Sequence, residues 1–267
     1  MYDIKNKVVI ITGAGGGIGS PLSFEFGKNG AVVVIAARSL EKLKRLETLL
    51  MVHNIKVFPV VLDLTSKDSI RSMIKKILKK YGRIDILVNN AAVGLFETVG
   101  DSRQNDIKKL FETNLFGPLL CIQLVLPHMR KRKNGLIVNM SSAVSKHSLY
   151  HQGIYSASKA ALERVTEAVS IEEYKNGIKT LLVIPDRTKT AFRSNVLGSK
   201  KYAKLPFKLP ESKPKKVAEK IINAIKRGNA VYYTSLRGKA YSIASGLYPE
   251  VISEIYKKSY GKFTKQK

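Results

Sequence analysis

The stretch Lys7-Val-Val-Ile-Ile-Thr12-Gly13-Ala-Gly-Gly-Gly17-Ile-Gly19 decides the fold of this chain. Its first half is a short run of β-branched apolar residues, which is typical of a parallel strand buried on both faces. Its second half is a glycine-rich turn, and the helical stretch that follows tolerates Pro21 in its first turn. A strand, a glycine loop and a helix N-terminus in this order form an anion site, because backbone NH groups and the helix dipole favour phosphate.

The spacing of the glycines distinguishes two dinucleotide-binding patterns. G-x-G-x-x-G fails, because a pattern begun at Gly13 and Gly15 needs a third glycine where Ile18 stands. The pattern T-G-x-x-x-G-x-G fits, with Thr12, Gly13, Gly17 and Gly19. A tight turn without a ligand is the alternative, but the strand-loop-helix context favours a dinucleotide site.

Strands and helices alternate along the chain from this point. The pattern predicts an α/β fold, a Rossmann-like doubly wound parallel sheet of about seven strands with helices on both faces, in a single domain over residues 1–267. Ligands of such sheets bind at the carboxyl ends of the strands. The expected strands are residues 7–12, 31–37, 57–62, 84–88, 136–140, 180–184 and 230–234.

The end of the second expected strand bears on the choice of cofactor. An acidic residue about 20 residues after the glycines would bind the adenosine ribose hydroxyls of NAD, but Ala37 and Arg38 stand there. A guanidinium presents a fork of donors that matches a 2′-phosphate. We therefore expect NADP(H) rather than NAD(H); a solvated loop arginine is the alternative.

A second informative stretch, Ser142 to Lys159, reads SAVSKHSLYHQGIYSASK. Tyr155 and Lys159 are four residues apart, so they share a face if this segment is helical. An ammonium beside a phenol lowers a pKa that is ordinarily near ~10, which makes a general acid and base for a carbonyl or an alcohol. Ser142 ends an expected strand, so its hydroxyl can reach the substrate oxygen. The alternative is a partly packed Tyr155 and a solvated Lys159.

Taken together, these motifs resemble the classical short-chain dehydrogenase/reductase family over roughly residues 5–190. The resemblance implies that Tyr155 is the general acid/base, that Ser142 orients the substrate oxygen, and that Lys159 holds the nicotinamide ribose and lowers the Tyr155 pKa. It also implies that Asn114 anchors a water of the proton relay, that Asp63 contacts the adenine and that Thr190 contacts the carboxamide. The implied cofactor-binding residues are Thr12, Gly13, Gly17, Ile18, Gly19, Arg38, Asp63, Leu64, Asn90, Ala91, Tyr155, Lys159, Pro185, Thr188 and Thr190.

Three positions depart from the family pattern. Ala92 stands where Asn-Asn-Ala-Gly would have its glycine, and Asp186 stands where Pro-Gly would have its glycine. Asp tolerates the left-handed conformation better than most residues. Gly16 stands where NADP-preferring members often carry a basic residue.

Residues 191–267 contain the expected substrate lid and a basic C-terminal part. Segment 195–214 places Val196, Leu197, Tyr202, Leu205, Phe207 and Leu209 between lysines, which favours a lid over a lipophilic substrate; a pair of helices packed on the core is the alternative. Segment 239–258 is amphipathic, so it either packs on the domain or lies on an anionic membrane. His147 and His151 lack a third ligand at metal-site spacing, so we expect no metal; they either line the substrate entrance or are ordinary loop residues.

The net charge of +27 limits the possible partners. Residues 200–267 alone hold 17 Lys and Arg against 4 acidic residues. The basic residues are dispersed, without interleaved aromatic residues, so we expect no nucleic acid. One cysteine, no signal-peptide pattern and an apolar stretch at 115–129 too short for a bilayer favour a cytoplasmic protein; a cytoplasmic protein peripheral to the membrane is the alternative.

The expected function is an NADP(H)-dependent oxidoreductase that acts on a lipophilic carbonyl or secondary alcohol. A 3-oxoacyl thioester reductase is an alternative, because a basic surface suits an acidic carrier. A non-catalytic NADP(H)-sensing protein is a second alternative from another class. The family resemblance implies a homo-oligomer in which the helices that hold Asn114 and Tyr155 pair.

Overall fold

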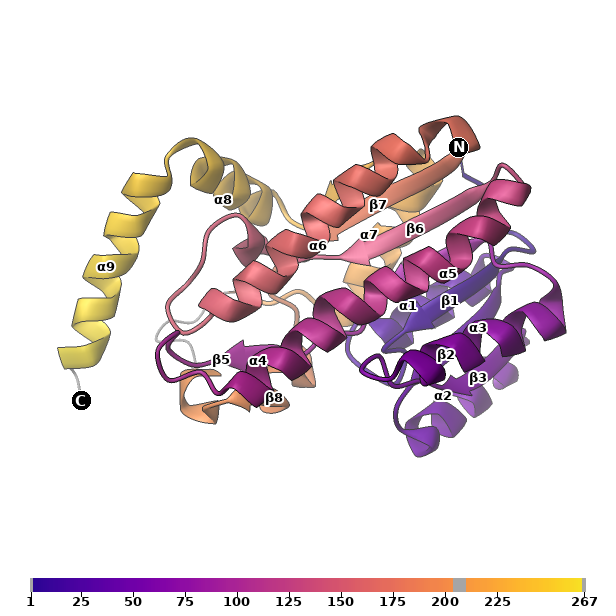
Figure 1. Cartoon of the computed structure of the whole chain (residues 1–267), viewed down its shortest axis with the longest axis horizontal. Coiled ribbons are helices and arrows are strands. Elements are labelled where there is room, and N and C mark those ends of the chain that lie inside the picture. The colour runs from indigo at the N-terminus through magenta and orange to yellow at the C-terminus, as the bar shows by residue number, and fades with distance from the viewer. Residues whose placement is uncertain (1, 204–209, 266–267) are drawn as a thin grey trace.

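The computed structural model describes residues 2–203 and 210–265. Its main sheet has seven parallel strands in the order β3-β2-β1-β4-β6-β7-β9 (Figure 1). The strand order reverses between β1 and β4, which opens a crevice at their carboxyl ends. The strands are β1 (Val8–Thr12), β2 (Val32–Ala37), β3 (Val57–Val61), β4 (Ile86–Asn89), β6 (Gly135–Met140), β7 (Ile178–Ile184) and β9 (Val231–Tyr233).

Two apolar layers cover this sheet because successive strand side chains point to opposite faces. Val9 and Ile11 of β1 pack with α1 (Gly19–Lys28), α2 (Leu40–Val52) and α7 (Pro214–Arg227). Val8 and Ile10 pack on the other face with α3 (Lys67–Tyr81), α5 (Gly117–Lys131) and α6 (Gly153–Glu172). The predicted doubly wound α/β fold is confirmed.

The fourth strand begins two residues later than expected. Asp85 is fully buried, and its carboxylate accepts a hydrogen bond from the backbone NH of Val8 at 2.9 Å and is bound by Arg83. Its side chain therefore holds the amino ends of β1 and β4 together, and the regular ladder starts only at Ile86.

The long helical segment Gln104–Lys131 is interrupted by a π-helical turn. It consists of α4 (Gln104–Phe111), the π turn η1 (Glu112–Phe116) and α5. The combined helix is long and apolar enough to cross a membrane, which the sequence analysis did not anticipate. Cys121, Val125 and Met129 are fully buried against the sheet, so this helix packs as a core helix here.

A small second sheet was not expected from the sequence. β5 (Gly94–Phe96) pairs with β8 (Val196–Gly198), which begins the expected lid segment. The short helices η4 (Ala191–Ser194) and η5 (Lys200–Ala203) flank β8, so the described part of this segment is not the alternative pair of helices. Leu205, Phe207 and Leu209 lie outside the described residues.

Two C-terminal helices, α8 (Leu236–Leu247) and α9 (Pro249–Lys265), lie at the end of the molecule that is farthest from β3 (Figure 1). Asp186 holds the start of α8, because its carboxylate accepts hydrogen bonds from Ser235 at 2.8 Å and Arg237 at 2.7 Å. Asp186 does not have a positive φ, so the conformational freedom of glycine is not needed at this position. The carboxylate has a structural use that glycine would lack.

Candidate active site

A polar link joins the carboxyl ends of the two central strands. The Thr12 hydroxyl donates to the carbonyl of Val88 at 3.3 Å and accepts from the backbone NH groups of Asn90 and Ala91, both at 3.1 Å. The Asn90 amide donates back to the carbonyls of Thr12, at 2.8 Å, and Gly13. These bonds hold open the crevice in which the expected cofactor residues lie.

The glycine-rich loop packs directly against this link. Gly13 and Gly17 have φ of +69° and +57°, in the region that favours glycine. A Cβ added at Gly13 would lie 2.8 Å from Cα of Ala91, and one added at Gly19 would lie 2.4 Å from the carbonyl oxygen of Gly13. Side chains are therefore excluded on the inner side of the loop, whereas a Cβ at Gly16 would meet nothing within 4 Å.

The loop also meets the segment that follows β7. A Cβ added at Gly17 would lie 3.9 Å from Cγ2 of Thr190. Thr190 caps η4, and the Thr188 hydroxyl donates to the carbonyl of Asp186 at 2.8 Å, directly after Pro185. The structure thus brings the glycine loop next to Thr190, the last of the expected cofactor residues. A glycine cradle at a helix N-terminus, open on its outer side, fits a dinucleotide pyrophosphate.

The adenosine side of the crevice carries unpaired cations. Arg38 is exposed after β2 and makes no hydrogen bond or ion pair with any described residue. Asp63 accepts from the backbone NH and the hydroxyl of Thr65, both at 2.9 Å, and Leu64 is buried in the core. Ile18 likewise packs on the core as the residue before α1.

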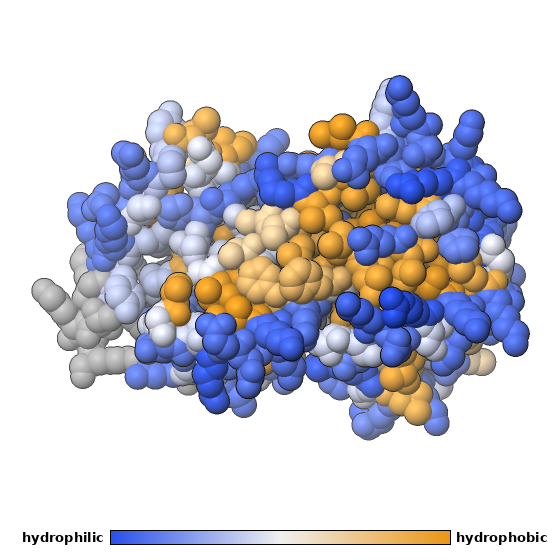
Figure 2. Space-filling view, viewed as in Figure 1, coloured by the Kyte–Doolittle hydropathy of each residue, from blue (hydrophilic) through white to orange (hydrophobic). Residues whose placement is uncertain are grey.

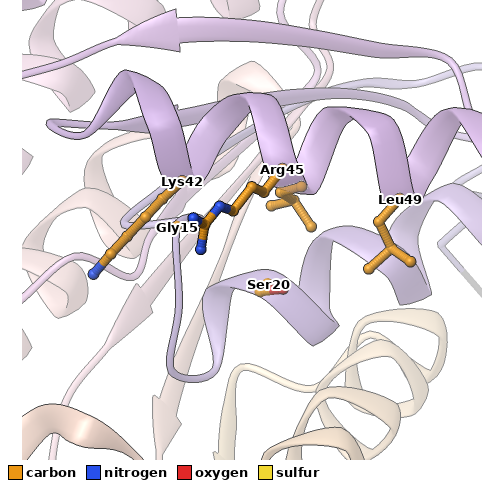
Figure 3. Close-up of a pocket in the computed structure, with 6 residues that line it drawn as sticks. Gly15, Ser20, Lys42, Arg45 and Leu49 are labelled. Atoms are coloured by element: carbon orange, nitrogen blue, oxygen red, sulfur yellow. The ribbon is translucent and has the colours of Figure 1, made fainter.

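A cavity of about 350 Å³ lies between α1 and α2 beside the glycine loop (Figure 3). Lys42 and Arg45 extend from α2 past Gly15 in this view. The sequence analysis missed both cations, although they lie in the first two turns of the helix after Arg38. The lining residues are Gly15, Ser20, Lys42, Arg45, Leu46 and Leu49.

Tyr155 and Ser142 form the centre of the site. The phenol is 7% exposed, packs with Leu95, Leu110 and Val144, and is hydrogen-bonded to Ser142. Burial raises the pKa of Tyr155 to about 12, although the Ser142 hydrogen bond and the nearby charge of Arg193 act in the opposite direction. The net shift is thus opposite to the lowering expected from Lys159, because the ring lies in an apolar cluster.

Lys159 is buried, so the alternative of a solvated lysine is wrong. Its ammonium donates to the carbonyl of Met140 at 2.9 Å. Burial lowers the pKa of Lys159 to about 8, and the charge of Glu163 counteracts part of this effect. The ammonium is therefore bound to the end of β6 and lies on the same helix as Tyr155.

Asn114 lies fully buried in the π turn. Its amide exchanges two hydrogen bonds of 2.9 Å with the backbone of Val93 and donates to the Ser158 hydroxyl at 3.1 Å. Ser158 in turn donates to the carbonyl of Tyr155 at 2.7 Å. Asn114 therefore connects the helix of Tyr155 to the loop after β4, and its role in a water relay stays a prediction.

Glu163 is a buried carboxylate that the sequence analysis missed. It accepts hydrogen bonds from the hydroxyls of Ser141, at 2.6 Å, and Ser145, and its second oxygen pairs with Lys146 at 2.8 Å. These three partners flank Ser142 on both sides. Its position four residues after Lys159 was the available signal, because it places both charges on one helix face. Glu163 positions the loop that carries Ser142.

No group of three or more His, Cys, Asp or Glu side chains gathers to hold a metal within residues 2–203 and 210–265. The His147 ring stacks with Tyr256 of α9. The His151 ring packs against Tyr202 of η5 and Tyr260 of α9.

Known proteins are similar to this chain in sequence and in fold. The family model for short chain dehydrogenases matches residues 7–200, so the chain belongs to the short-chain dehydrogenase/reductase family of oxidoreductases. The chain is 36% identical over 182 residues to a 3-oxoacyl-[acyl-carrier-protein] reductase of Thermotoga maritima, covering 68% of this chain and 74% of that protein. It is 33% identical over 193 residues to a 3-ketodihydrosphingosine reductase of Bacteroides thetaiotaomicron, covering 72% and 68%.

Solved structures agree with this assignment. A short-chain dehydrogenase from Streptomyces avermitilis superposes with a TM-score of 0.81 at 28% identity, covering 98% of this chain and 99% of that one. A metagenomic short-chain oxidoreductase in complex with NADP superposes with a TM-score of 0.72 at 26% identity, covering 87% and 96%.

Replacing Glu163 tests its positioning role. We expect Glu163→Gln to lower kcat about tenfold, because the amide loses the pairing with Lys146 and the negative charge beside Lys159. The expected effect on KM for the cofactor is small, since the glycine loop is untouched. The matched control is Glu167→Gln, an exposed carboxylate one turn further along α6 that pairs with Arg164. An unchanged kcat and pH profile in Glu163→Gln would refute the role.

The buried ammonium of Lys159 predicts a pH dependence of stability. Folding lowers the pKa of Lys159 from 10.5 to about 8. Below pH 8, burial of the charged form therefore lowers the free energy of unfolding by its full amount. This penalty is relieved as pH rises from 8 toward 10.5, because the folded lysine loses its proton first. In urea unfolding, the free energy of unfolding of wild type should rise by about 2 kcal/mol relative to that of Lys159→Met between pH 7 and pH 10. A difference that does not change with pH contradicts the burial of a charged Lys159.

Proposed function

We propose that this chain is an NADP(H)-dependent oxidoreductase that transfers a hydride between the nicotinamide and a lipophilic carbonyl or secondary alcohol. One observation carries the proposal: Tyr155, hydrogen-bonded to Ser142, lies on the same helix as the buried ammonium of Lys159, at the carboxyl edge of the sheet that also holds the glycine loop. When bound, the cofactor supplies or accepts the hydride at the substrate carbon.

Proton transfer is the task of the chain's own residues. With a pKa of about 12, the Tyr155 phenol holds its proton at neutral pH, which suits donation to a carbonyl oxygen. The Ser142 hydroxyl lies within hydrogen-bond distance of the phenol and would orient the same carbonyl oxygen. The phenolate left after donation is stabilised by the Arg193 guanidinium, whose charge lowers the pKa of the phenol. Lys159 would hold the nicotinamide ribose, and a water at Asn114 would return the proton.

Four features support NADP(H) as the cofactor. Arg38 and Lys42 have no partner among the described side chains. Lys42 lies beside Gly15, whose added Cβ would be 3.3 Å from Cβ of Lys42 and 3.5 Å from Cβ of Ala37, the residue before Arg38. Arg45 lines the adjoining cavity. The N-terminus of α2, capped by Ser39, adds a favourable dipole for a 2′-phosphate. The metagenomic relative with NADP is consistent with this preference.

Removal of these cations tests the cofactor preference. Because Arg38 and Lys42 would meet only the 2′-phosphate, Arg38→Ala and Lys42→Ala should each weaken NADPH binding about tenfold and leave NADH binding unchanged. Calorimetry with both cofactors measures this difference, and Arg71→Ala on α3, an exposed residue paired with Asp68, is the control. If the variants lose NADPH and NADH affinity equally, or if wild type binds NADH more tightly than NADPH, the proposed preference for NADP(H) is excluded.

Apolar side chains around Tyr155 support a lipophilic substrate. Leu95, Val144, Leu149, Phe192 and Leu197 cluster about the phenol, and the Phe192 ring centroid lies 5.7 Å from that of Tyr155. The similarity to a 3-ketodihydrosphingosine reductase supports a long-chain substrate. The similarity to a 3-oxoacyl-[acyl-carrier-protein] reductase supports the second candidate, a 3-oxoacyl thioester.

Exposed apolar side chains support a homo-oligomer. Figure 2 shows an apolar band that runs over α5 and α6, and Phe116 at the start of this band is 57% exposed. Hydrophilic residues, in blue in this view, border the band. We propose that two copies pair through these helices.

A substrate screen with NADPH tests the reaction. We expect lipophilic ketones to be reduced and Tyr155→Phe to lower kcat about 10²–10⁴-fold, the usual range for a lost general acid, with NADPH still bound. NADPH fluorescence measures binding separately from turnover. Full activity in Tyr155→Phe would refute the mechanism, and NADPH binding without turnover of any carbonyl would favour the non-catalytic sensor.

A further inference from the structure

The two C-terminal helices α8 and α9 form an arm with a distinct inner face. The Tyr241 hydroxyl donates to the carbonyl of His147 at 3.2 Å, and Ser253 is hydrogen-bonded to Nε2 of His147 at 3.4 Å. The Tyr256 ring stacks on the same imidazole, with centroids 5.9 Å apart. The C-terminal arm thus holds the loop 146–152, which leads directly into the helix of Tyr155.

An aromatic cluster extends this contact toward the lid. Tyr260 of α9 lies with its ring centroid 5.2 Å from Tyr150 and 5.6 Å from His151. The His151 imidazole stacks on Tyr202 of η5 at 3.7 Å, and its carbonyl accepts from the NH of Glu97 after β5 at 3.0 Å. The arm, the loop and the small β5–β8 sheet therefore surround the substrate end of the site as one packed unit.

The outer face of the arm is apolar and exposed. Leu236, Ile243 and Leu247 recur at helical spacing along α8. Tyr248 follows at the end of α8, and Val251 and Ile255 continue on α9; each of the six is at least 48% exposed. Figure 2 shows apolar atoms gathered over α8 where it turns into α9. Single exposed apolar residues are ordinary, but six at this spacing form a surface that fits an apolar partner.

The positive charge of the arm favours an anionic lipid surface over a second copy of this chain as the partner of its outer face. Residues 200–267 hold 17 Lys and Arg against 4 acidic residues, and Lys239 and Lys258 are exposed on the arm. A second copy of this arm would bring the same positive charge against it, which is unfavourable. An anionic lipid surface offers both an apolar boundary for the leucines and valines and negative head groups for the lysines.

We propose that the C-terminal arm lays its outer face in the surface of an anionic bilayer and that the substrate enters the site from that bilayer. The second half of this proposal rests on the proposed function, because it identifies the substrate as a carbonyl dissolved in lipid. The arm's inner face then connects the lipid surface to the loop before Tyr155 through His147 and His151. No part of the chain needs to cross the membrane for this contact.

Vesicle binding by the full chain tests the docking surface. Wild type should co-sediment with vesicles of equal parts phosphatidylcholine and phosphatidylglycerol at low salt, and weakly with phosphatidylcholine alone. The triple variant Leu247→Ser, Val251→Ser, Ile255→Ser should bind the anionic vesicles at least about tenfold more weakly. Val52→Ser, which changes a 74% exposed apolar residue on α2, should bind like wild type. Raising salt to about 1 M should weaken wild-type binding.

A second readout separates docking from catalysis. The triple variant should reduce a water-soluble carbonyl like wild type and a vesicle-dissolved carbonyl about tenfold more slowly, with unchanged NADPH binding as evidence of folding. Vesicle binding without any carbonyl turnover would refute the proposed function and the substrate route but leave the docking surface supported. Wild type that fails to bind anionic vesicles, a triple variant that binds them fully, or arm-dependent dimers in sedimentation without lipid would overturn the proposal.

Discussion

The contact between the Lys159 ammonium and the carbonyl of Met140 is the one on which the site depends. The contact places the buried ammonium of α6 at the carboxyl end of β6. There the backbone carbonyl supplies a hydrogen bond that the ammonium needs, because burial removes it from water. One helical turn later, Glu163 binds the hydroxyls on both sides of Ser142. Tyr155 comes from the same helix and Ser142 from the same strand end, so these two contacts set their distance and direction.

The features that could be predicted from the sequence are those defined by the spacing of residues close together in the chain. The glycine loop, the buried strand that precedes it and the pair Tyr155 and Lys159 are each defined by neighbours within a few residues, and the structure brings them together. The pKa of Tyr155 could not be predicted, because its direction depends on burial by Leu95, Leu110 and Val144, which are remote in sequence. The π turn and the strand Gly94–Phe96 were missed for the same reason, since Val93 and Leu197 supply their partners.

The two ends of the crevice are built on different principles. At the cofactor end, backbone groups and glycines are fixed by the Thr12 and Asn90 hydrogen bonds between adjacent strands. At the substrate end, the walls come from segments after β7 and from the arm, joined by Asp186 to α8 and by His147 to α9. We therefore expect changes at the substrate end to alter the choice of substrate and to leave the contacts of Lys159 and Glu163 intact.

Burial of the Tyr155 phenol raises its pKa, so the phenol holds its proton at neutral pH. The most direct measurement is an NMR titration of the free protein with ¹³Cζ-labelled tyrosine, in which the Tyr155 signal is assigned by its loss in Tyr155→Phe. We predict that this signal stays in the protonated form beyond pH 10 and titrates near pH 12. Ionisation of Tyr155 at or below the ordinary tyrosine pKa of about 10 would contradict the account.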